Sequence, residues 1–360
     1  MQQSFTYRLR RLGHGLFGSW LNATLTIISL WLLFLAIPPF IDWAIINSKW
    51  LPIDPKACIQ GEGACWAFIQ AKTRFILFGR FPYEEQWRAL LACVLVLFAL
   101  VISGVWKFWH WQVWKRFLIG LWACVLIFSA VLLYGGVFGL SKVRIGLWGG
   151  LPVTLILSLF GIFFAFLLSI FLALGRRSRL PIVRWVSIGY IELIRGVPLV
   201  GILFMAAVLF PMFLPEQLPM STLLRAQIAF ILFFAAYMAE VIRGGLQALD
   251  KGQYEAAAAI GLTRWQRMRW IMLPQALTTT IPSLVNIFIG AFKDTSLVVI
   301  ISMHDLLGTT KASMNDPHWL GVYIEPYLFT AAIYFVFCAS ISLYSQRLEK
   351  YLNIGNLNAQ

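Results

Sequence analysis

Residues 252–277 of the chain read GQYEAAAAIGLTRWQRMRWIMLPQAL, and this stretch lies between two long apolar runs. Four consecutive alanines follow Glu255, and alanine has the highest helix propensity of all residues. Gly261 is typical of a residue that ends a helix. Thr263, with Gln266 three residues later, is a capping-box pattern that begins another helix. The pattern therefore predicts a compact helix–turn–helix between two hydrophobic segments.

The two sides of this helix–turn–helix are expected to differ. Ala256 and Ala257 make one side small, so that another surface can approach closely, whereas the other side carries Arg264, Arg267 and Arg269. A loop that only connects two spans would account for the basic residues. It would not account for the small side, because membrane binding favours bulky apolar groups. From the residues alone, a passive connection and a docking surface both stay open.

The composition places this stretch in a membrane protein. Of the 360 residues, 60% are hydrophobic and 12% are charged, against about 25% charged residues in a typical soluble domain. A transmembrane helix needs roughly 20 apolar residues, and several runs reach that length. We therefore expect an all-α polytopic membrane protein with about eight transmembrane helices. The spans are predicted at Leu21–Ile46, Ala89–Trp106, Phe117–Phe138, Leu151–Leu174, Ile182–Phe213, Ala226–Ile242, Thr280–Ser302 and Pro326–Ser345.

The fifth span is the exception in this series. It contains the charged residues Arg184, Glu192 and Arg195, followed by Pro198. Proline interrupts helices because it has no N–H and restricts the residue before it. The span is therefore either a broken helix or one helix with a long cytoplasmic end.

The distribution of Lys and Arg predicts the orientation. If the N-terminus is inside, the inner segments 1–20, 107–116, 175–184, 243–279 and 346–360 carry most of these residues, as the positive-inside bias requires. Both termini and the loop around Gly261 are then cytoplasmic. The net charge of +14 suits a lipid bilayer with anionic headgroups, and nucleic acid is not needed to explain it.

Two of the five cysteines lie in the first outer loop. Cys58 and Cys65 flank the residues IQGEGA. In an oxidising compartment they could close a small disulfide loop, and the alternative is two free thiols. No histidine lies near them, so a metal site is not expected. The following stretch WAFIQAKTRFILFG is apolar with two charges, which predicts an interfacial helix.

The opening stretch also resembles a known motif. Glu255-Ala256-Ala257, three further residues, Gly261, nine further residues and Ile271-Met272-Leu273-Pro274 match the EAA loop, E-A-A-x3-G-x9-I-x-L-P, of type I ABC-importer permeases. The stretches YMAEVIRGGLQALDKGQYEAA, LPQAL, KDTSL, GLPVTLILSL and YIELIRGVPLVGILF are similar to the polar-amino-acid subfamily. The whole chain looks like the M-type permease subunit of a general L-amino-acid transporter.

The resemblance implies a domain organisation. Residues 1–145 would be an N-terminal extension with three transmembrane helices and a large periplasmic loop. Residues 146–346 would be the type I permease core with five transmembrane helices, and residues 347–360 a cytoplasmic tail. The protein would lie in the cell inner membrane as a multi-pass subunit.

The resemblance also implies partners and a coupling loop. ABC ATPase subunits would bind below, a second homologous permease subunit beside, and a periplasmic amino-acid-binding protein would deliver the L-amino acid substrate. The residues that would make the ATPase-coupling loop are Glu255, Ala256, Ala257, Gly261, Leu273 and Pro274.

The chain is not expected to be an enzyme. A phosphate-binding P-loop needs G-x4-G-K-[ST], and no Gly-Lys dipeptide occurs in the sequence. No cofactor is therefore expected in this chain, and a partner subunit would use ATP. We find no nucleophile–base pair and no metal cluster in the sequence, so no catalytic residues are predicted.

Charged residues inside an apolar run indicate the substrate pathway. Lys293, Asp294, Thr295 and Ser296 fall within the seventh run, where a carboxylate is costly and usually paired or in a wet cavity. Asp294 and the two hydroxyls would face a polar amino acid. The alternative is a purely structural pair between Asp294 and Lys293.

Other charged residues favour structural roles. Glu192 with Arg195 and Glu240 with Arg243 have the i,i+3 spacing of ion pairs on one helix. Residues 303–325 are expected to be an outer loop with His304 on its surface. An ion-gradient-driven secondary transporter and a membrane-embedded enzyme are the alternative functions, but the former has no use for an EAA loop and the latter lacks a catalytic constellation.

Overall fold

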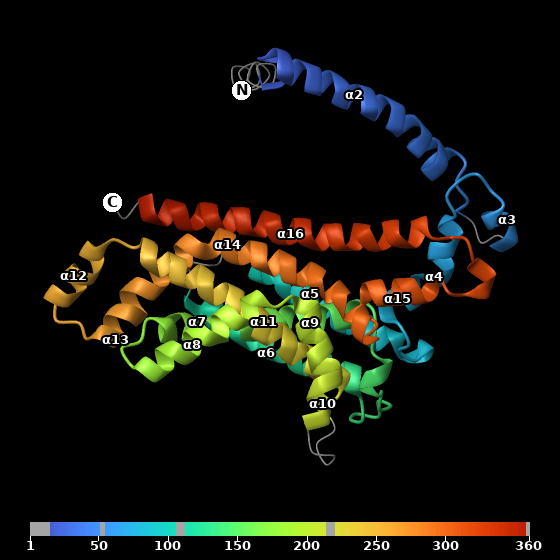
Figure 1. Ribbon diagram of the computed structural model, residues 1–360. Helices are drawn as coiled ribbons and strands as arrows, with labels where there is room; N and C mark the ends of the chain where they lie inside the picture. Colours follow the sequence, from blue (N-terminus) through green and yellow to red (C-terminus); the bar gives the residue numbers. More distant parts are fainter. Residues whose placement is uncertain (1–14, 51–54, 106–111, 214–219, 358–360) are drawn as a thin grey trace. The chain divides into compact units, whose positions relative to one another are not determined.

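The computed structural model describes residues 15–50, 55–105, 112–213 and 220–357. Every named secondary-structure element in these residues is a helix (Figure 1). Seven of these helices are long and apolar enough to cross a membrane, and one bent pair brings the number to eight. The all-α polytopic prediction is confirmed. Residues 1–14 of the predicted inner segment 1–20, residues 107–111 of the predicted inner segment 107–116 and residues 358–360 of the predicted tail lie outside the described residues.

The chain divides into two compact units. Unit 1 comprises Met1–Ala71 and Asp316–Pro326, and unit 2 comprises Lys72–Asn315 and Tyr327–Gln360. Unit 1 contains the helices α2 (Trp20–Ile41), η1 (Asp42–Ile46), α3 (Pro55–Ile59), the start of α4 (Trp66–Phe78) and η8 (Pro317–Trp319). No residue of α2 is buried, and its side chains are apolar all round, as befits a helix that lipid surrounds.

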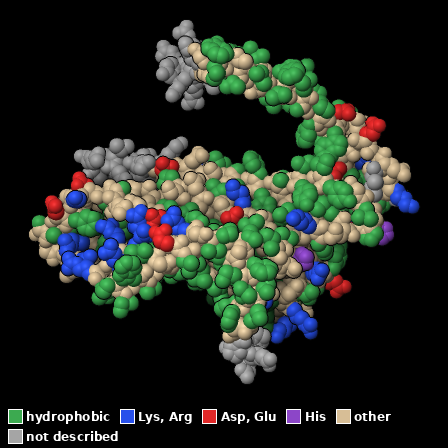
Figure 2. All heavy atoms as spheres, in the orientation of Figure 1, with side chains coloured by type: hydrophobic (Ala, Val, Ile, Leu, Met, Phe, Trp, Pro, Cys, Tyr) green, Lys and Arg blue, Asp and Glu red, His purple; other side chains and the backbone are tan. Residues whose placement is uncertain are grey.

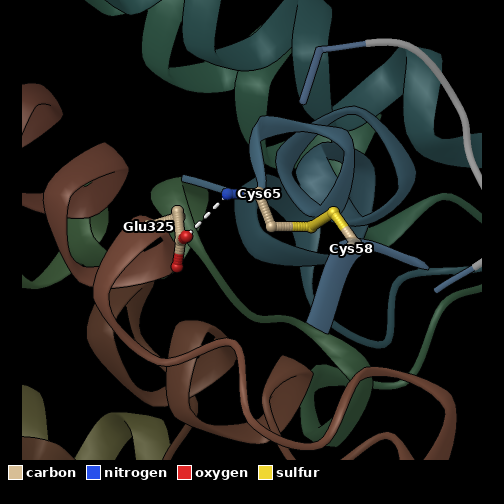
Figure 3. Close-up of a disulfide and its surroundings, with 3 residues drawn as sticks. All are labelled: Cys58, Cys65 and Glu325. Carbon is tan, nitrogen blue, oxygen red and sulfur yellow. Dashed lines mark hydrogen bonds between the residues drawn. A yellow bond between two sulfur atoms is a disulfide. The ribbon is translucent and has the colours of Figure 1, made fainter. Parts of the chain in front are cut away.

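The predicted outer loop between α2 and α4 folds around a disulfide. Cys58 and Cys65 are joined by a disulfide, and the backbone N–H of Cys65 donates to Glu325 Oε1 at 2.6 Å (Figure 3). The rings of Phe68 and Trp319 meet edge to face with centroids 5.5 Å apart. These contacts hold two segments together that lie some 260 residues apart in the chain.

Unit 2 contains the remaining helices. In chain order they are η2 (Tyr83–Glu85), α5 (Gln86–Ser103), α6 (Gln112–Tyr134), η4 (Ile145–Leu147), α7 (Leu151–Arg176), α8 (Pro181–Gly196), α9 (Leu199–Phe204), η5 (Met205–Leu209), α10 (Phe210–Phe213), α11 (Thr222–Ala248), α12 (Lys251–Ala259), α13 (Arg264–Arg267), η6 (Met268–Met272), α14 (Leu273–Asp294), η7 (Thr295–Ile301), α15 (Leu306–Ser313) and α16 (Ile324–Leu357), the last crossing from unit 1.

The helices α7, α11 and α14 form the centre of unit 2, and α7 and α11 share the largest contact. Small residues such as Ala229, Ala235 and Ala239 of α11 are buried there, which permits the close helix packing typical of membranes. At Gly245 a Cβ atom would overlap the Thr280 side chain and the Ala276 backbone. Glycine therefore sets the distance between α11 and α14.

The fifth predicted span is a broken helix, which confirms one of its two interpretations. The helices α8 and α9–α10 are bent by 103°. The bend follows from Pro198, because Val197 before it is extended, with φ −109° and ψ 134°, as a residue before proline prefers.

Residues 303–325 were predicted to be an outer loop. The structure differs in one respect, because Leu306–Ser313 in this segment form a helix, α15, that is largely buried. Asp305 caps α15 by accepting from the N–H of Gly308 at 2.8 Å, and the Tyr334 hydroxyl donates to its other oxygen at 3.0 Å. Burial raises the pKa of Asp305 to about 6. Thr309 and Thr310 are buried. Burying these polar side chains without partners would be unfavourable, and their hydrogen bonds offset that free-energy cost.

Candidate functional site: coupling loop and transport pathway

The predicted helix–turn–helix is confirmed as α12 and α13, which lie together at one end of unit 2 (Figure 1). Asp250 caps α12 by accepting from the N–H of Gly252 at 2.9 Å. Thr263 and Gln266 form the predicted capping box, in which the Thr263 N–H donates to Gln266 Oε1 at 2.8 Å. Short helices are marginal on their own, and these caps satisfy their free N–H groups.

Gly261 ends α12 in the left-handed region, with φ +78°. Its N–H donates to the Ala258 carbonyl at 3.0 Å, and the Leu262 N–H donates to the Ala257 carbonyl at 3.3 Å. A Cβ atom at Gly261 would meet nothing within 4 Å. The glycine is therefore favoured by the left-handed backbone conformation, and space plays no part.

The two alanines of the motif face different ways, which corrects the expectation of one small side. Ala257 is buried, with 2% of its surface exposed, whereas Ala256 is exposed beside Glu255. Successive residues of an α-helix lie about 100° apart, because 3.6 residues make a turn. Ile260 is 73% exposed at the end of α12. The outward face of α12 therefore contains Glu255 and Ala256, and the bulky apolar side chain of Ile260 lies exposed just after the end of the helix.

Leu273 and Pro274 are the first two residues of α14. Leu273 packs against the core of unit 2, while Pro274 is exposed. The preceding residues Met268–Met272 are π-helical and join α13 to α14, so that one helix runs from Arg264 to Ile301 and its π-helical turn lies directly before Pro274. The helix that leaves the loop thus runs directly into the membrane core.

An ion-pair network joins α7, α8 and α11 close to the loop. Arg176 of α7 lies 3.0 Å from Glu192 of α8 and 3.1 Å from Glu240 of α11. The predicted Glu240–Arg243 pair is confirmed, with Arg243 Nε donating to Glu240 at 2.9 Å. The predicted Glu192–Arg195 pair is wrong. Arg195 instead lies over the Tyr237 ring, 5.8 Å from its centroid, because a neighbouring helix supplies the partner for Glu192.

The four predicted pathway residues lie where α14 passes into η7. Lys293 is exposed and Asp294 is partly exposed, and neither side chain forms an ion pair or hydrogen bond with another described residue. Thr295 is buried, and its hydroxyl donates to the Phe292 carbonyl at 2.8 Å. Ser296 is partly buried. The structural alternative of a Lys293–Asp294 pair is therefore not formed, and Thr295 points away from the exposed side.

A polar face on α14 was missed by the sequence reasoning. Between residues 276 and 293, only Thr279, Ser283, Asn286 and Lys293 are exposed, and all four are polar. Their spacing of four, three and seven residues keeps them on one side of a helix. A lipid-facing helix shows the opposite pattern, with apolar residues outward. The 3–4 spacing of polar residues in an apolar run was the available signal.

The comparisons with known proteins bear on this arrangement. Residues 165–353 match the family described as "Binding-protein-dependent transport system inner membrane component", and the match covers more than half of the chain. The chain belongs to this family. It is a multi-pass inner-membrane permease of an ATP-driven ABC transport system, and it is a transport component, not an enzyme.

Relatives along nearly the whole chain narrow the class. The chain is 45% identical to the inner membrane amino-acid ABC transporter permease protein YhdY of Escherichia coli (strain K12), covering 94% of this chain and 92% of YhdY. It is 36% identical to the glutamate/glutamine/aspartate/asparagine transport system permease protein BztC of Rhodobacter capsulatus, with the same coverage. The crystal structure of an amino acid ABC transporter with histidines is 33% identical over 56% of this chain and 92% of that one, with a TM-score of 0.51.

These findings confirm the resemblance in the EAA loop. They set aside the ion-gradient-driven secondary transporter and the membrane-embedded enzyme, because family membership implies an ATPase and a binding protein as partners. Within the described residues, no three His, Cys, Asp or Glu side chains gather as a metal site would require.

Proposed function

We propose a division of labour within this chain, which is the permease subunit of an ATP-driven amino-acid import system. The loop of α12 and α13 is the mechanical joint to the ATPase, and the polar face of α14 is the part of the substrate pathway that this subunit contributes. The observation that carries the proposal is that one unbroken helix, from Arg264 to Ile301, contains α13 of the loop, the polar face of α14 and Asp294.

The coupling residues have separate roles. Glu255 and Ala256 face outward from α12, where a small side chain lets the ATPase surface approach and a carboxylate pairs with a basic group. Ala257 packs the helix against its own chain, and Gly261 permits the turn. Leu273 and Pro274 fix the start of α14. Closure of the ATPase on ATP is a rigid-body motion, so the joint transmits it only if it is stiff.

The pathway residues act through charge and hydrogen bonding. The Asp294 side chain forms no hydrogen bond or ion pair with a described residue, although the charge of the neighbouring Lys293 acts on it, and Ser296 lies beside it. A carboxylate in a membrane helix that lacks a partner needs water or a ligand. We assign the substrate ammonium to Asp294 and the substrate carboxylate to Lys293. The polar face formed by Thr279, Ser283 and Asn286 continues the wet surface along α14.

We propose the orientation from the distribution of Lys and Arg along the sequence, and the partners from the family. The N- and C-termini and the α12–α13 loop are cytoplasmic, and the disulfide of unit 1 is periplasmic. A second homologous permease subunit covers the polar face of α14 from the other side of the pathway, and a periplasmic amino-acid-binding protein delivers substrate. The core of the permease is residues 146–346, with 1–145 as an extension and 347–360 as the tail.

The substrate class is L-amino acids. YhdY is described as an amino-acid permease protein, and BztC as a permease protein for glutamate, glutamine, aspartate and asparagine. Polar and acidic amino acids share an α-ammonium and an α-carboxylate group. The adjacent opposite charges of Asp294 and Lys293 are complementary to these two groups.

The experiment is purification of the tagged chain in mild detergent, with mass spectrometry of the associated proteins. We expect an ATPase and a second, homologous permease. In proteoliposomes, the complex should take up amino acids only with ATP inside and binding protein outside. Uptake by the chain alone, driven by an ion gradient without ATP, would contradict the proposal.

A further inference from the structure

A basic pocket of about 500 Å³ opens between the ends of α7, α8 and α11 and the short helix α13. The residues that line it are Arg176, Arg177, Ser178, Arg184, Ile188, Arg243, Gln247 and Arg264. Figure 2 shows Lys and Arg side chains gathered over the end of unit 2 that carries α12 and α13. Five arginines line one pocket, and none of its lining residues is a carboxylate.

The positive charge of the pocket is only partly compensated. Two of the five arginines form ion pairs with Glu240, just outside the lining. Arg177 donates to the Leu246 carbonyl at 3.0 Å. The side chains of Arg184 and Arg264 form no hydrogen bond or ion pair with any described residue. Three guanidinium groups therefore lack a carboxylate, and like charges held this close favour a bound anion.

Exposed apolar side chains form a stripe beside the pocket at the start of α8. Arg184 and Ile188 line the pocket, while Leu180, one helical turn before Arg184, is 64% exposed and Trp185, next to Arg184, is 73% exposed. Tryptophan at this exposure beside arginine is typical of the interface between headgroups and acyl chains. A free anion would use the arginines alone, whereas a lipid uses both the arginines and the stripe.

We propose that this pocket binds the phosphate of an anionic phospholipid, with its acyl chains along the exposed stripe of α8. The planar guanidinium fork matches phosphate oxygens in a bidentate way. The inference rests on the proposed orientation, which puts the pocket at the cytoplasmic leaflet, where anionic lipids attract basic residues.

The bound lipid has a consequence for coupling. Arg264 belongs to α13 of the coupling loop, whereas Arg176, Arg184 and Arg243 belong to membrane helices. A phosphate held by both sets ties the loop to the membrane core. Anionic lipid therefore stiffens the joint that transmits ATPase closure, and the coupling efficiency depends on the lipid composition of the inner leaflet.

The test is native mass spectrometry of the purified permease complex, titrated with phosphatidylglycerol or phosphatidylcholine. We expect preferential binding of phosphatidylglycerol. The double variant Arg184→Gln/Arg264→Gln should lower the affinity for phosphatidylglycerol at least tenfold, because each hydrogen bond to a charged group contributes about a factor of ten or more. Arg179→Gln/Arg269→Gln is the matched control, since both arginines are exposed on the same segments but do not line the pocket.

Each outcome decides the proposal. An equal loss in the control variant would show attraction by diffuse surface charge and would overturn it. Displacement of phosphatidylglycerol by inorganic phosphate at similar affinity would show a free-anion site and would also overturn the lipid assignment. If the double variant does not assemble, Arg184→Gln alone tests the same loss at an exposed position. Lipid binding is read without transport, so failure of the coupling-loop proposal leaves this measurement intact.

Discussion

Gly261 is the residue on which the geometry of the coupling loop depends most. Its φ of +78° lies in the left-handed region, which costs other residues about 1–2 kcal/mol and β-branched residues more. We predict that Gly261→Val abolishes uptake while the subunit stays at normal abundance, because the strain displaces the outward face of α12 without touching the membrane core. Uptake and ATP hydrolysis in proteoliposomes measure this.

The matched control at the same position is Gly261→Asn. Asparagine tolerates the left-handed region, and a Cβ atom there meets nothing within 4 Å. The asparagine variant should therefore keep most of the substrate-stimulated hydrolysis. Normal coupling in the valine variant would show that the turn is not the joint.

Asp294 is the residue that tests the pathway. Asp294→Asn keeps the shape but removes the charge, so we predict a tenfold or greater weakening of the apparent substrate affinity, since a charged hydrogen bond contributes about that much. Complex assembly should be unchanged. Because Lys293 and Asp294 form no ion pair, the double neutral variant should not recover uptake. Full recovery would indicate a structural pair after all.

Residue spacing predicted some contacts and not others. The Thr263–Gln266 capping box and the Glu240–Arg243 pair are local, and the structure has both. Glu192 instead pairs with Arg176, which lies on another helix. Ala256 and Ala257 are neighbours in the sequence but face different directions, because successive residues of an α-helix lie about 100° apart. Local hydrogen bonds can be predicted from spacing, whereas partners from other helices depend on packing.

At the scale of elements, α14 presents its polar side outward. Cysteines introduced at Asn286 should react with a small water-soluble thiol reagent in the assembled complex, and faster when substrate is absent. Val285, next in the chain but only 8% exposed, supplies the control and should stay unreactive as Val285→Cys. If Asn286→Cys is as unreactive as the control, the polar face is packed against protein and lines no wet pathway.

The elements differ in how far the sequence predicted them. The long apolar runs and the break at Pro198 follow from hydropathy and proline chemistry, and both are present. The buried helix α15 was not predicted, because its threonines and the preceding Asp305 are polar residues that are typical of an outer loop. The missing information was tertiary: Thr154 of α7 accepts from the Leu306 N–H at 3.0 Å, and Tyr334 of α16 donates to Asp305.

At the scale of the whole molecule, the orientation can be tested through the outer disulfide. We predict that an impermeant thiol reagent labels Cys58 and Cys65 in intact spheroplasts only after reduction, because the pair is bonded and is periplasmic in the proposed orientation. Glu325→Gln provides a second variant, since it weakens the acceptor of the Cys65 N–H and should make reduction easier. Labelling without reductant would show free thiols, and no labelling after reduction would contradict the orientation.

The function was the most predictable feature of the molecule, because it resides in a local motif. The match from Glu255 to Pro274 indicated the family before any packing was known, and the family comparison confirms it. The basic pocket was not predicted, because its arginines come from four separate helices. A site that one segment makes can be found in a sequence, whereas a site that several helices share requires the fold.

The central claim is that the outward face of α12 docks on an ATPase, and site-specific cross-linking tests it most directly. In a background without the free cysteines Cys93, Cys124 and Cys338, Ala256→Cys should cross-link to the ATPase subunit through a short bifunctional thiol–amine reagent. Ala257→Cys, at a position that is 2% exposed, should not. ATP should change the yield at position 256, as closure moves the joint. No cross-link at position 256, or an equal yield at both positions, would contradict the account.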